Sequence, residues 1–273
     1  MTEPLVVTER RGKVLEILLN RAPANAINME TSREIYAALK ELQDDPTLTV
    51  GLFRSAGERI FSAGWDLKEV AAAGAIDLEA ENDPDAGYGP GGFAGITEYW
   101  DLKKPVICAV QGAAVGGGFE IVLACDVIFM AEIAFFALPE MQRGILADGG
   151  AVQKLPRLIP YNVARELLLT GRRMEPEEAL KWGLVHKVVP QDQLLEEARA
   201  FAEELSHGAP LALQALKEVL AYLDCMPVRE AMAKVKPGAG TGLPVYDRLH
   251  ESEDAMEGIT AFAEKRDPVW KGK

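Results

Sequence analysis

Short apolar runs and amphipathic stretches follow each other along the chain up to residue 200. The apolar runs predict strands at 5–8, 14–19, 50–53, 105–110, 127–130, 134–138 and 185–189. Apolar residues at helical spacing predict helices at 29–43, 67–73, 96–103, 119–124, 162–170 and 176–182. Because the order strand, strand, helix recurs, we expect a mixed α/β core.

The pattern is purely helical from residue 192 onward. Helices are predicted at 192–205, 210–223 and 252–265, with a loop rich in glycine at 236–242. We therefore expect residues 1–200 to form the core and residues 201–273 to form a helical region. A helical tail that follows a complete core often covers that core or docks on another subunit.

The stretch 104–126 combines a short apolar strand, a glycine-rich turn and the start of an apolar helix. We expect the turn, residues 111–118, to lack regular structure, because it contains Gly112, Gly116, Gly117 and Gly118. Backbone N–H groups at such a helix start are unpaired and favour negative charge. The spacing matches neither the phosphate-binding loop nor the dinucleotide-binding pattern. Glycines chosen only for close packing are the alternative interpretation.

Two glutamates are candidates for acid–base chemistry. Glu120 lies in the first turn of the predicted helix, where it would repel a phosphate but would suit a neutral group that becomes negative during reaction. Glu140 follows twenty residues later, just beyond a predicted strand. Two carboxyls that face one cavity can divide the acid and base roles. The alternative for each is a solvated or capping glutamate, which the apolar neighbours of Glu120 make less attractive.

Two further stretches that precede the central strand are candidates for a functional role. The small-residue turn Phe-Ser-Ala-Gly-Trp-Asp at 61–66 is a second place where backbone N–H groups could be presented. Residues 74–95 are the least regular part of the chain, acidic at first and then rich in glycine. Loops of this length are usually functional or disordered.

Composition narrows the classes of partner and site. The chain has 273 residues with 29 basic and 42 acidic side chains, a net charge of −13, which argues against nucleic acid and membranes as partners. An anionic ligand would therefore need local basic groups. Three cysteines without a CxxC pair favour a reducing, cytoplasmic location. The three scattered histidines predict no metal site, and we find no apolar run of membrane-spanning length.

Several motifs together resemble the crotonase superfamily of enoyl-CoA hydratases and isomerases. Lys-Pro-Val-Ile-x-Ala-Val-x-Gly-x-Ala-x-Gly-Gly-Gly-x-Glu begins at Lys104, and Leu-Pro-Glu ends at Glu140. Matching segments lie at 21–27, 61–67, 170–174, 179–185 and 262–266, so the resemblance covers nearly the whole chain. It implies a spiral of repeated ββα units with a C-terminal helical region, usually assembled as trimers or dimers of trimers. It implies no metal or redox cofactor, since coenzyme A is part of the substrate.

The resemblance also assigns roles to residues. The two oxyanion-hole N–H groups fall on Trp65 and Gly117, and the paired glutamates that activate water and exchange a proton at the α-carbon fall on Glu120 and Glu140. The coenzyme A contacts fall on Asn25, Ala26, Ala63, Gly64, Asp66, Leu67, Phe262 and Lys265. In the family the last two often come from a neighbouring subunit. For Lys265 an ordinary solvated lysine is the alternative.

Within the superfamily, the segments 89–95, 135–140, 171–174, 177–180, 252–255 and 267–272 resemble the carnitinyl-CoA dehydratase branch. This resemblance implies reversible hydration of crotonobetainyl-CoA, whose trimethylammonium group would need aromatic faces or a carboxylate. The region that shapes the acyl pocket in this family contains Tyr88, Phe93, Glu98, Tyr99 and Trp100.

The chain departs from the common hydratase pattern at two positions. Asp148 lies eight residues after Glu140, as an acid does in dienoyl-CoA isomerases. It could shuttle a proton in an isomerase, orient a substrate group, or serve only the turn before two glycines. Trp65 replaces the commoner alanine but keeps its backbone N–H. A general enoyl-CoA hydratase, an enoyl- or dienoyl-CoA isomerase and a non-catalytic RNA-binding or scaffold protein therefore remain as alternatives; the glutamates and the low pI argue against the last.

Overall fold

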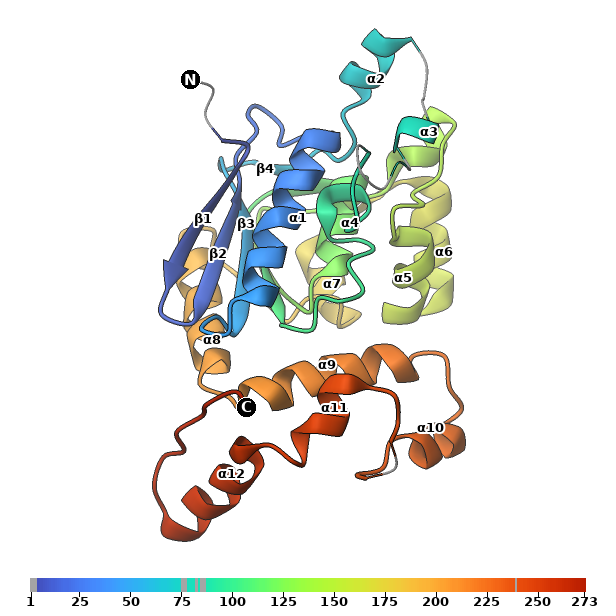
Figure 1. Cartoon of the computed structure of the whole chain (residues 1–273). Helices are drawn as coiled ribbons and strands as arrows, with labels where there is room; N and C mark the ends of the chain where they lie inside the picture. The colour runs from blue at the N-terminus through green and yellow to red at the C-terminus, as the bar shows by residue number, and fades with distance from the viewer. Residues whose placement is uncertain (1–3, 75–77, 82, 84–86, 239) are drawn as a thin grey trace.

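The computed structural model describes residues 4–74, 78–81, 83, 87–238 and 240–273 (Figure 1). Part of the irregular stretch 74–95 therefore lies outside the described residues. Ten strands form two sheets in the described part of the chain. The larger sheet has the order β1 (Val6–Arg11), β2 (Val14–Leu19), β3 (Val50–Ser55), β5 (Val106–Val110), β7 (Val127–Ala131) and β10 (Lys187–Val189). The smaller sheet has the order β4 (Ile60–Ser62), β6 (Ala113–Val115), β8 (Phe136–Ala137) and β9 (Arg173–Met174).

The larger sheet is parallel except at its first edge. β1 pairs antiparallel with β2, whereas β2, β3, β5, β7 and β10 run parallel. All five residues of β5 are buried, as expected for a strand covered on both faces. The strands β4 and β6 are parallel neighbours in the smaller sheet, so the turns that follow them lie close together.

Helices cover the sheets and position the turns between them. Around the core these are α1 (Met29–Asp44), α2 (Leu67–Ala73), α3 (Leu78–Glu81), α4 (Gly117–Ala124), α5 (Ala151–Leu158), α6 (Tyr161–Thr170), α7 (Pro176–Lys181) and α8 (Leu194–Ser206). The helix α1 begins at the N-cap Asn28. At its other end the buried Lys104 ammonium donates to the carbonyls of Leu42 and Asp45, which have no partners within the helix.

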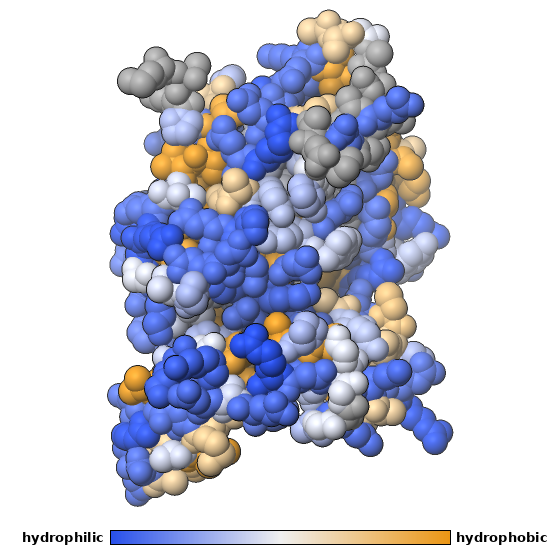
Figure 2. Space-filling model, viewed as in Figure 1, coloured by the Kyte–Doolittle hydropathy of each residue, from blue (hydrophilic) through white to orange (hydrophobic). Residues whose placement is uncertain are grey.

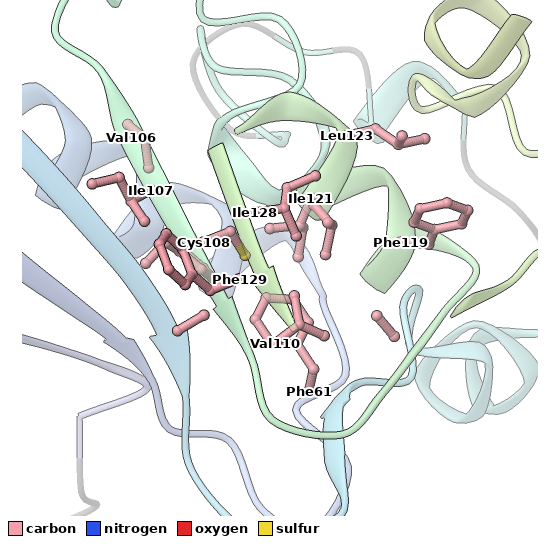
Figure 3. Close-up of a cluster of buried hydrophobic side chains, with 14 of the residues drawn as sticks. Phe61, Val106, Ile107, Cys108, Val110, Phe119, Ile121, Leu123, Ile128 and Phe129 are labelled. Atoms are coloured by element: carbon pink, nitrogen blue, oxygen red, sulfur yellow. The ribbon is translucent and has the colours of Figure 1, made fainter. Parts of the chain in front are cut away.

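The core that fixes α4 is apolar and closely packed. Figure 3 shows side chains of β4, β5, β7 and α4 together, among them Phe61, Val106, Cys108, Val110, Phe119, Ile121, Leu123, Ile128 and Phe129. The rings of Phe119 and Phe136 stack with centroids 4.3 Å apart and so tie α4 to β8. Because α4 is held on several sides, its first turn is a rigid support for Glu120.

Two local predictions were wrong, and several helices were missed. Residues 96–103 form turns rather than a helix, because Ala94 adopts a left-handed conformation and the N–H of Glu98 bonds back to Gly91. The stretch 111–118 contains the short strand β6, which pairs with β4 and β8, and α4 begins at Gly117. The helices α5, α10 (Val228–Lys234) and α11 (Pro244–Leu249) were not predicted.

The C-terminal helices form a layer at one end of the molecule. Figure 1 shows α9 (Pro210–Leu223), α10, α11 and α12 (Glu253–Glu264) below the sheets, in orange and red. The helix α8 runs across the expected boundary at residue 200 and packs on β3, β5 and β7. The surface view in Figure 2 shows apolar patches on this layer among polar side chains. No helix in the described ranges is both long and apolar enough to cross a membrane.

Candidate active site

A cavity of about 460 Å³ opens between the loop after β2, the turn before α2, the start of α4 and the turn after β8. Its lining is formed by Arg21, Ala22, Pro23, Ala24, Ala26, Ala63, Trp65, Asp66, Leu67, Lys68, Val115, Gly116, Gly117, Pro139, Glu140, Arg143 and Ile145. The segments that supply these residues are far apart in sequence. The pairing of β4, β6 and β8 brings them together.

Two backbone N–H groups meet at one wall of this cavity. Gly64 has a φ of +78°, and a Cβ atom built there would lie 2.5 Å from the Gly117 nitrogen. A short parallel bridge between Ile27 and Trp65 fixes the position of Trp65. Within the described residues, the N–H groups of Trp65 and Gly117 donate to no acceptor of the chain. The turn that carries Trp65 and the start of α4 therefore present two free donors side by side.

Glu120 is buried beside these donors. Its side chain lies in the first turn of α4, and its Oε1 accepts a hydrogen bond of 3.0 Å from the N–H of Ala151, the first residue of α5. Burial raises the pKa of Glu120 to about 7 against the hydrogen bond from Ala151. The charges of Glu140 and Asp148 also raise this pKa. Glu120 is thus fixed in position, and its carboxyl holds a proton to higher pH than an ordinary glutamate does.

Glu140 lines the cavity directly. It lies in the short helix Pro139–Arg143, and its residue surface is 8% exposed. Its Oε1 lies 2.6 Å from a Cβ atom built at Gly116, so a side chain at that glycine would displace the carboxyl. Its Oε2 is buried and has no hydrogen-bond partner in the described residues. Burial raises the pKa of Glu140, the Asp148 charge adds to the rise, and the Arg143 charge opposes it.

Asp148 lies close to both glutamates. It is exposed on the turn that precedes α5, and its backbone carbonyl accepts a hydrogen bond from Gln153. The adjacent Gly149 lies against the carboxyl of Glu120, since a Cβ built there would be 2.7 Å from Oε2. The structure thus brings together three of the carboxyls singled out in the sequence.

The residues predicted to contact coenzyme A divide into three groups. Ala26, Ala63, Asp66 and Leu67 line the cavity, and Gly64 lies directly behind the Gly117 nitrogen. Asp66 caps α2 and pairs with Arg21 at 2.6 Å.

Asn25 forms the second group by itself. Its side chain is buried and donates to the carbonyls of Ala56 and Phe61, while its Oδ1 accepts from the N–H of Arg21. Asn25 therefore holds the loop that carries Ala26, and its side chain does not line the cavity.

Phe262 and Lys265 form the third group. They lie at the end of α12, which Figure 1 places at the end of the molecule opposite α2. Phe262 is 88% exposed, and neither residue lines the cavity. A single chain does not bring these two residues to the site.

The aromatic residues expected at the acyl pocket lie in different parts of the structure. The rings of Tyr88 and Phe93 meet edge to face at 5.5 Å, and the Phe93 ring lies against Gly117. Burial raises the pKa of Tyr88, which shares a side-chain hydrogen bond with Trp65. Tyr99 instead packs on Tyr36 with centroids 4.9 Å apart.

The other two residues of that region face solvent. Trp100 is 72% exposed and Glu98 is exposed, and neither lines the cavity. The structure thus places Tyr88 and Phe93 beside the two N–H donors and leaves Tyr99, Trp100 and Glu98 away from them.

Two basic residues at the cavity were missed in the sequence. Lys68 and Arg143 both line it, together with Arg21. They supply the local positive charge that an anionic ligand of an acidic protein requires. Only their positions in the sequence could have indicated this role, because Lys68 comes soon after the turn at 61–66 and Arg143 lies one helical turn after Glu140.

Comparisons with known proteins agree with this geometry. Residues 9–273 match the profile of the enoyl-CoA hydratase/isomerase family. Carnitinyl-CoA dehydratases of Citrobacter koseri and Salmonella typhimurium are each 50% identical over 273 residues, which is 100% of both chains.

Solved structures show the same fold. An enoyl-CoA hydratase of Mycobacterium tuberculosis superposes with a TM-score of 0.86 at 35% identity, covering 99% of this chain and 100% of that chain. A probable enoyl-CoA hydratase/isomerase of Mycobacterium abscessus gives 0.85 at 36% identity, covering 100% of each. The predicted crotonase-like α/β fold is confirmed. The chain belongs to the enoyl-CoA hydratase/isomerase family.

Proposed function

We propose that the protein catalyses the reversible hydration of a 2-enoyl-CoA thioester, with crotonobetainyl-CoA and carnitinyl-CoA as its substrate pair. The observation that carries the proposal is that Glu140 and two free N–H donors line one cavity, with the buried Glu120 in the first turn of the helix that carries one of these donors. The full-length relatives at 50% identity that are named carnitinyl-CoA dehydratase support the acyl group.

The N–H groups of Trp65 and Gly117 bind the thioester oxygen. This oxygen gains negative charge as the enolate forms, and α4 directs its positive dipole end to the same place. Donors aimed at a developing oxyanion act mainly in the transition state. Loss of one typically costs about 10²–10³ in rate.

The two glutamates then act at neighbouring carbons. Glu140 lies against Gly116, next to the Gly117 donor, so its carboxyl is near the α-carbon, one bond from the carbonyl. Glu120, held by Ala151, orients water at the β-carbon. In hydration Glu120 takes a proton from water as the C–O bond forms, the alkene electrons move toward the thioester oxygen, and Glu140 gives a proton to the α-carbon. Dehydration reverses each transfer.

Coenzyme A binds along the basic side of the cavity. The turn with Ala63 and the segment with Ala26 are open to the nucleotide, and Arg21, Lys68 and Arg143 face its phosphates. Phe262 and Lys265 cover the nucleotide of a neighbouring subunit, since the cavity of the same chain lies at the opposite end of the molecule, near α2.

This arrangement requires an assembly, which we propose is a homotrimer or a dimer of trimers. The C-terminal helices expose large apolar side chains that an interface would bury, namely Leu216, Leu220, Val228, Met232, Met256, Ile259 and Phe262. Exposed apolar groups of this number on one region are typical of surfaces that meet another protein.

The position of Asp148 supports a second candidate function, that of an enoyl- or dienoyl-CoA isomerase, because its charge lies near both glutamates. Product analysis separates the two reactions. Hydration of crotonyl-CoA or crotonobetainyl-CoA gives a 3-hydroxyacyl thioester with an oxygen from labelled water, whereas isomerisation adds no oxygen. A product without the label would overturn the hydratase proposal.

A further inference from the structure

Asp148 occupies a position that the hydration chemistry does not use. Its carboxylate is exposed on the turn before α5 and has no hydrogen bond or ion pair within the described residues. The next residue, Gly149, touches the carboxyl of Glu120. On the other side of the turn, Ile145 lines the cavity with Glu140. We propose that Asp148 is the counter-ion of a quaternary ammonium group on the acyl chain and selects substrates that carry it.

This inference rests on the proposed function, which sets the direction of the substrate. The thioester oxygen lies at Trp65 and Gly117, the α-carbon near Glu140 and the β-carbon near Glu120. In crotonobetainyl-CoA a single methylene separates the β-carbon from the trimethylammonium nitrogen. Asp148 is the next residue along the turn from the Glu120 contact, at the exposed side of the turn, and its charge acts on both glutamates. It is therefore close enough to the β-carbon end of the substrate to pair with this nitrogen.

The charge distribution also points to a cationic ligand. Three carboxyls lie together, and the Asp148 charge opposes ionisation of both glutamates. For an apolar acyl group this third charge would only be a cost, because like charges repel in a partly buried site. Glu140 is a second, independent indication of a cationic ligand. Its Oε2 is buried and has no hydrogen-bond partner among the described residues, and its side chain lines the cavity. A fixed positive charge on the substrate would offset this excess of negative charge.

Aromatic faces, the other means of holding a quaternary ammonium, are less well placed. Tyr99 packs on Tyr36 away from the cavity, and Trp100 is exposed to solvent. Tyr88 and Phe93 contact the residues that carry the two N–H donors, at the thioester end. A carboxylate is therefore the better candidate for the cation, and Asp148 has no other partner in the described chain.

The test compares a charged substrate with its uncharged isostere. Crotonobetainyl-CoA and 5,5-dimethylhex-2-enoyl-CoA have the same shape, because carbon replaces the quaternary nitrogen in the second. We expect Asp148→Asn to lower kcat/KM for the charged thioester by about tenfold, mainly through KM, since the ion pair is partly screened by solvent. The isostere and crotonyl-CoA should change by less than about threefold, and Asp148→Glu should restore much of the preference.

Asp192→Asn is the matched control, because Asp192 is also exposed and has no ion pair in the described chain, but it follows β10 rather than lying on the turn beside Glu120. It should leave the ratio of charged to uncharged activity unchanged. Equal losses of Asp148→Asn on the charged substrate and its isostere would overturn the inference. So would a wild-type enzyme that turns over both equally, although its hydration of crotonyl-CoA would leave the hydratase function intact. No turnover of any of the three thioesters would refute both.

Discussion

At the scale of single residues, the site depends on two carboxyls that are held differently. Glu120 accepts a hydrogen bond from Ala151 and is fixed against α5. Glu140 leaves Oε2 unpartnered toward the cavity within the described chain. A fixed carboxyl is suited to orienting water, whereas a free oxygen is suited to exchanging a proton with the α-carbon. Burial raises the pKa of both carboxyls, so both hold a proton to higher pH than an ordinary glutamate does.

Removing either carboxyl should stop the reaction without preventing binding. We expect Glu140→Gln and Glu120→Gln each to lower kcat by roughly 10²–10⁴, because each loses a proton transfer. KM should change by only a few fold, as the oxyanion donors and the basic side of the cavity remain. Steady-state kinetics with crotonyl-CoA measure this, with the exposed Glu132→Gln as control. Near wild-type kcat in Glu140→Gln would contradict the assignment.

The raised pKa of Glu120 also predicts a pH-dependent cost in stability. The group has a pKa of about 7 in the folded protein against 4.5 as its ordinary value, so the folded state binds its proton more tightly. Wild-type stability is therefore lost as pH rises from about 4.5 through 7, and Glu120→Gln avoids this loss. The variant should gain up to about 3 kcal/mol in free energy of unfolding at pH 8 relative to pH 4.

Urea unfolding of both proteins at the two pH values measures this difference. The pH 4 comparison serves as the reference, because it contains any change in packing caused by the substitution. A difference between variant and wild type that stays constant with pH would show that Glu120 titrates normally.

At the scale of elements, the proposed oxyanion site depends on the contact between two turns. Residues 63–66 follow β4, the start of α4 follows β6, and these strands are parallel neighbours. Gly64 allows the contact, because any side chain there would meet the Gly117 nitrogen and the Val115 carbonyl. The geometry of the donors is therefore a property of the smaller sheet.

Gly64→Ala should remove activity by blocking this contact. Its Cβ would lie 2.5 Å from the Gly117 nitrogen, so we expect kcat to fall by about 10² or more. Gly74→Ala is a matched control, since its φ of +76° is nearly the same as +78° at Gly64 but nothing lies within 4 Å. Both variants carry the backbone strain of about 1–2 kcal/mol, and only Gly64→Ala should lose catalysis. Similar activity losses in both would assign the effect to strain.

The elements also show which features a sequence can predict. Helix α9 was predicted with the observed bounds, since Pro210 starts it and its apolar spacing is regular. The strand β6 was missed, because three residues between glycines carry no periodic signal and gain their pairing from β4 and β8. The predicted helix at 96–103 was wrong because the N–H of Glu98 bonds back to Gly91 instead of continuing a helix.

The candidate site was predictable to a similar degree. Glu120, Glu140 and the two glycine turns carried strong motifs, and the structure brings them together. Lys68 and Arg143 could not be distinguished from solvated cations, because only the folded chain places them at the cavity. Tyr99 and Trp100 were expected at the acyl pocket because of their place in the sequence. In the fold, Tyr99 packs on Tyr36 and Trp100 is exposed to solvent.

At the scale of the whole molecule, the C-terminal layer and the cavity lie at opposite ends of one chain. The layer exposes large apolar groups, and the cavity lacks the cover that Phe262 and Lys265 would give. Both observations are accounted for if subunits meet so that α12 of one chain approaches the cavity of another.

The assembly should have three or six times the chain mass of 29.7 kDa in analytical ultracentrifugation. We expect Leu220→Asp, on the exposed face of α9, to lower this mass, because a charge would be buried in the interface. Ile133→Asp, an exposed position in the turn after β7, is the comparison. A wild-type protein that sediments as a monomer would contradict the proposed assembly.

Hydration of crotonobetainyl-CoA and crotonyl-CoA by the wild-type protein, followed through the loss of the conjugated thioester absorbance, tests the proposed reaction most directly. Glu120, Glu140 and the two N–H donors predict loss of absorbance with both substrates, with formation of the 3-hydroxyacyl thioester and faster turnover of the charged one. Unchanged absorbance with both substrates would contradict the proposed hydration of 2-enoyl-CoA thioesters.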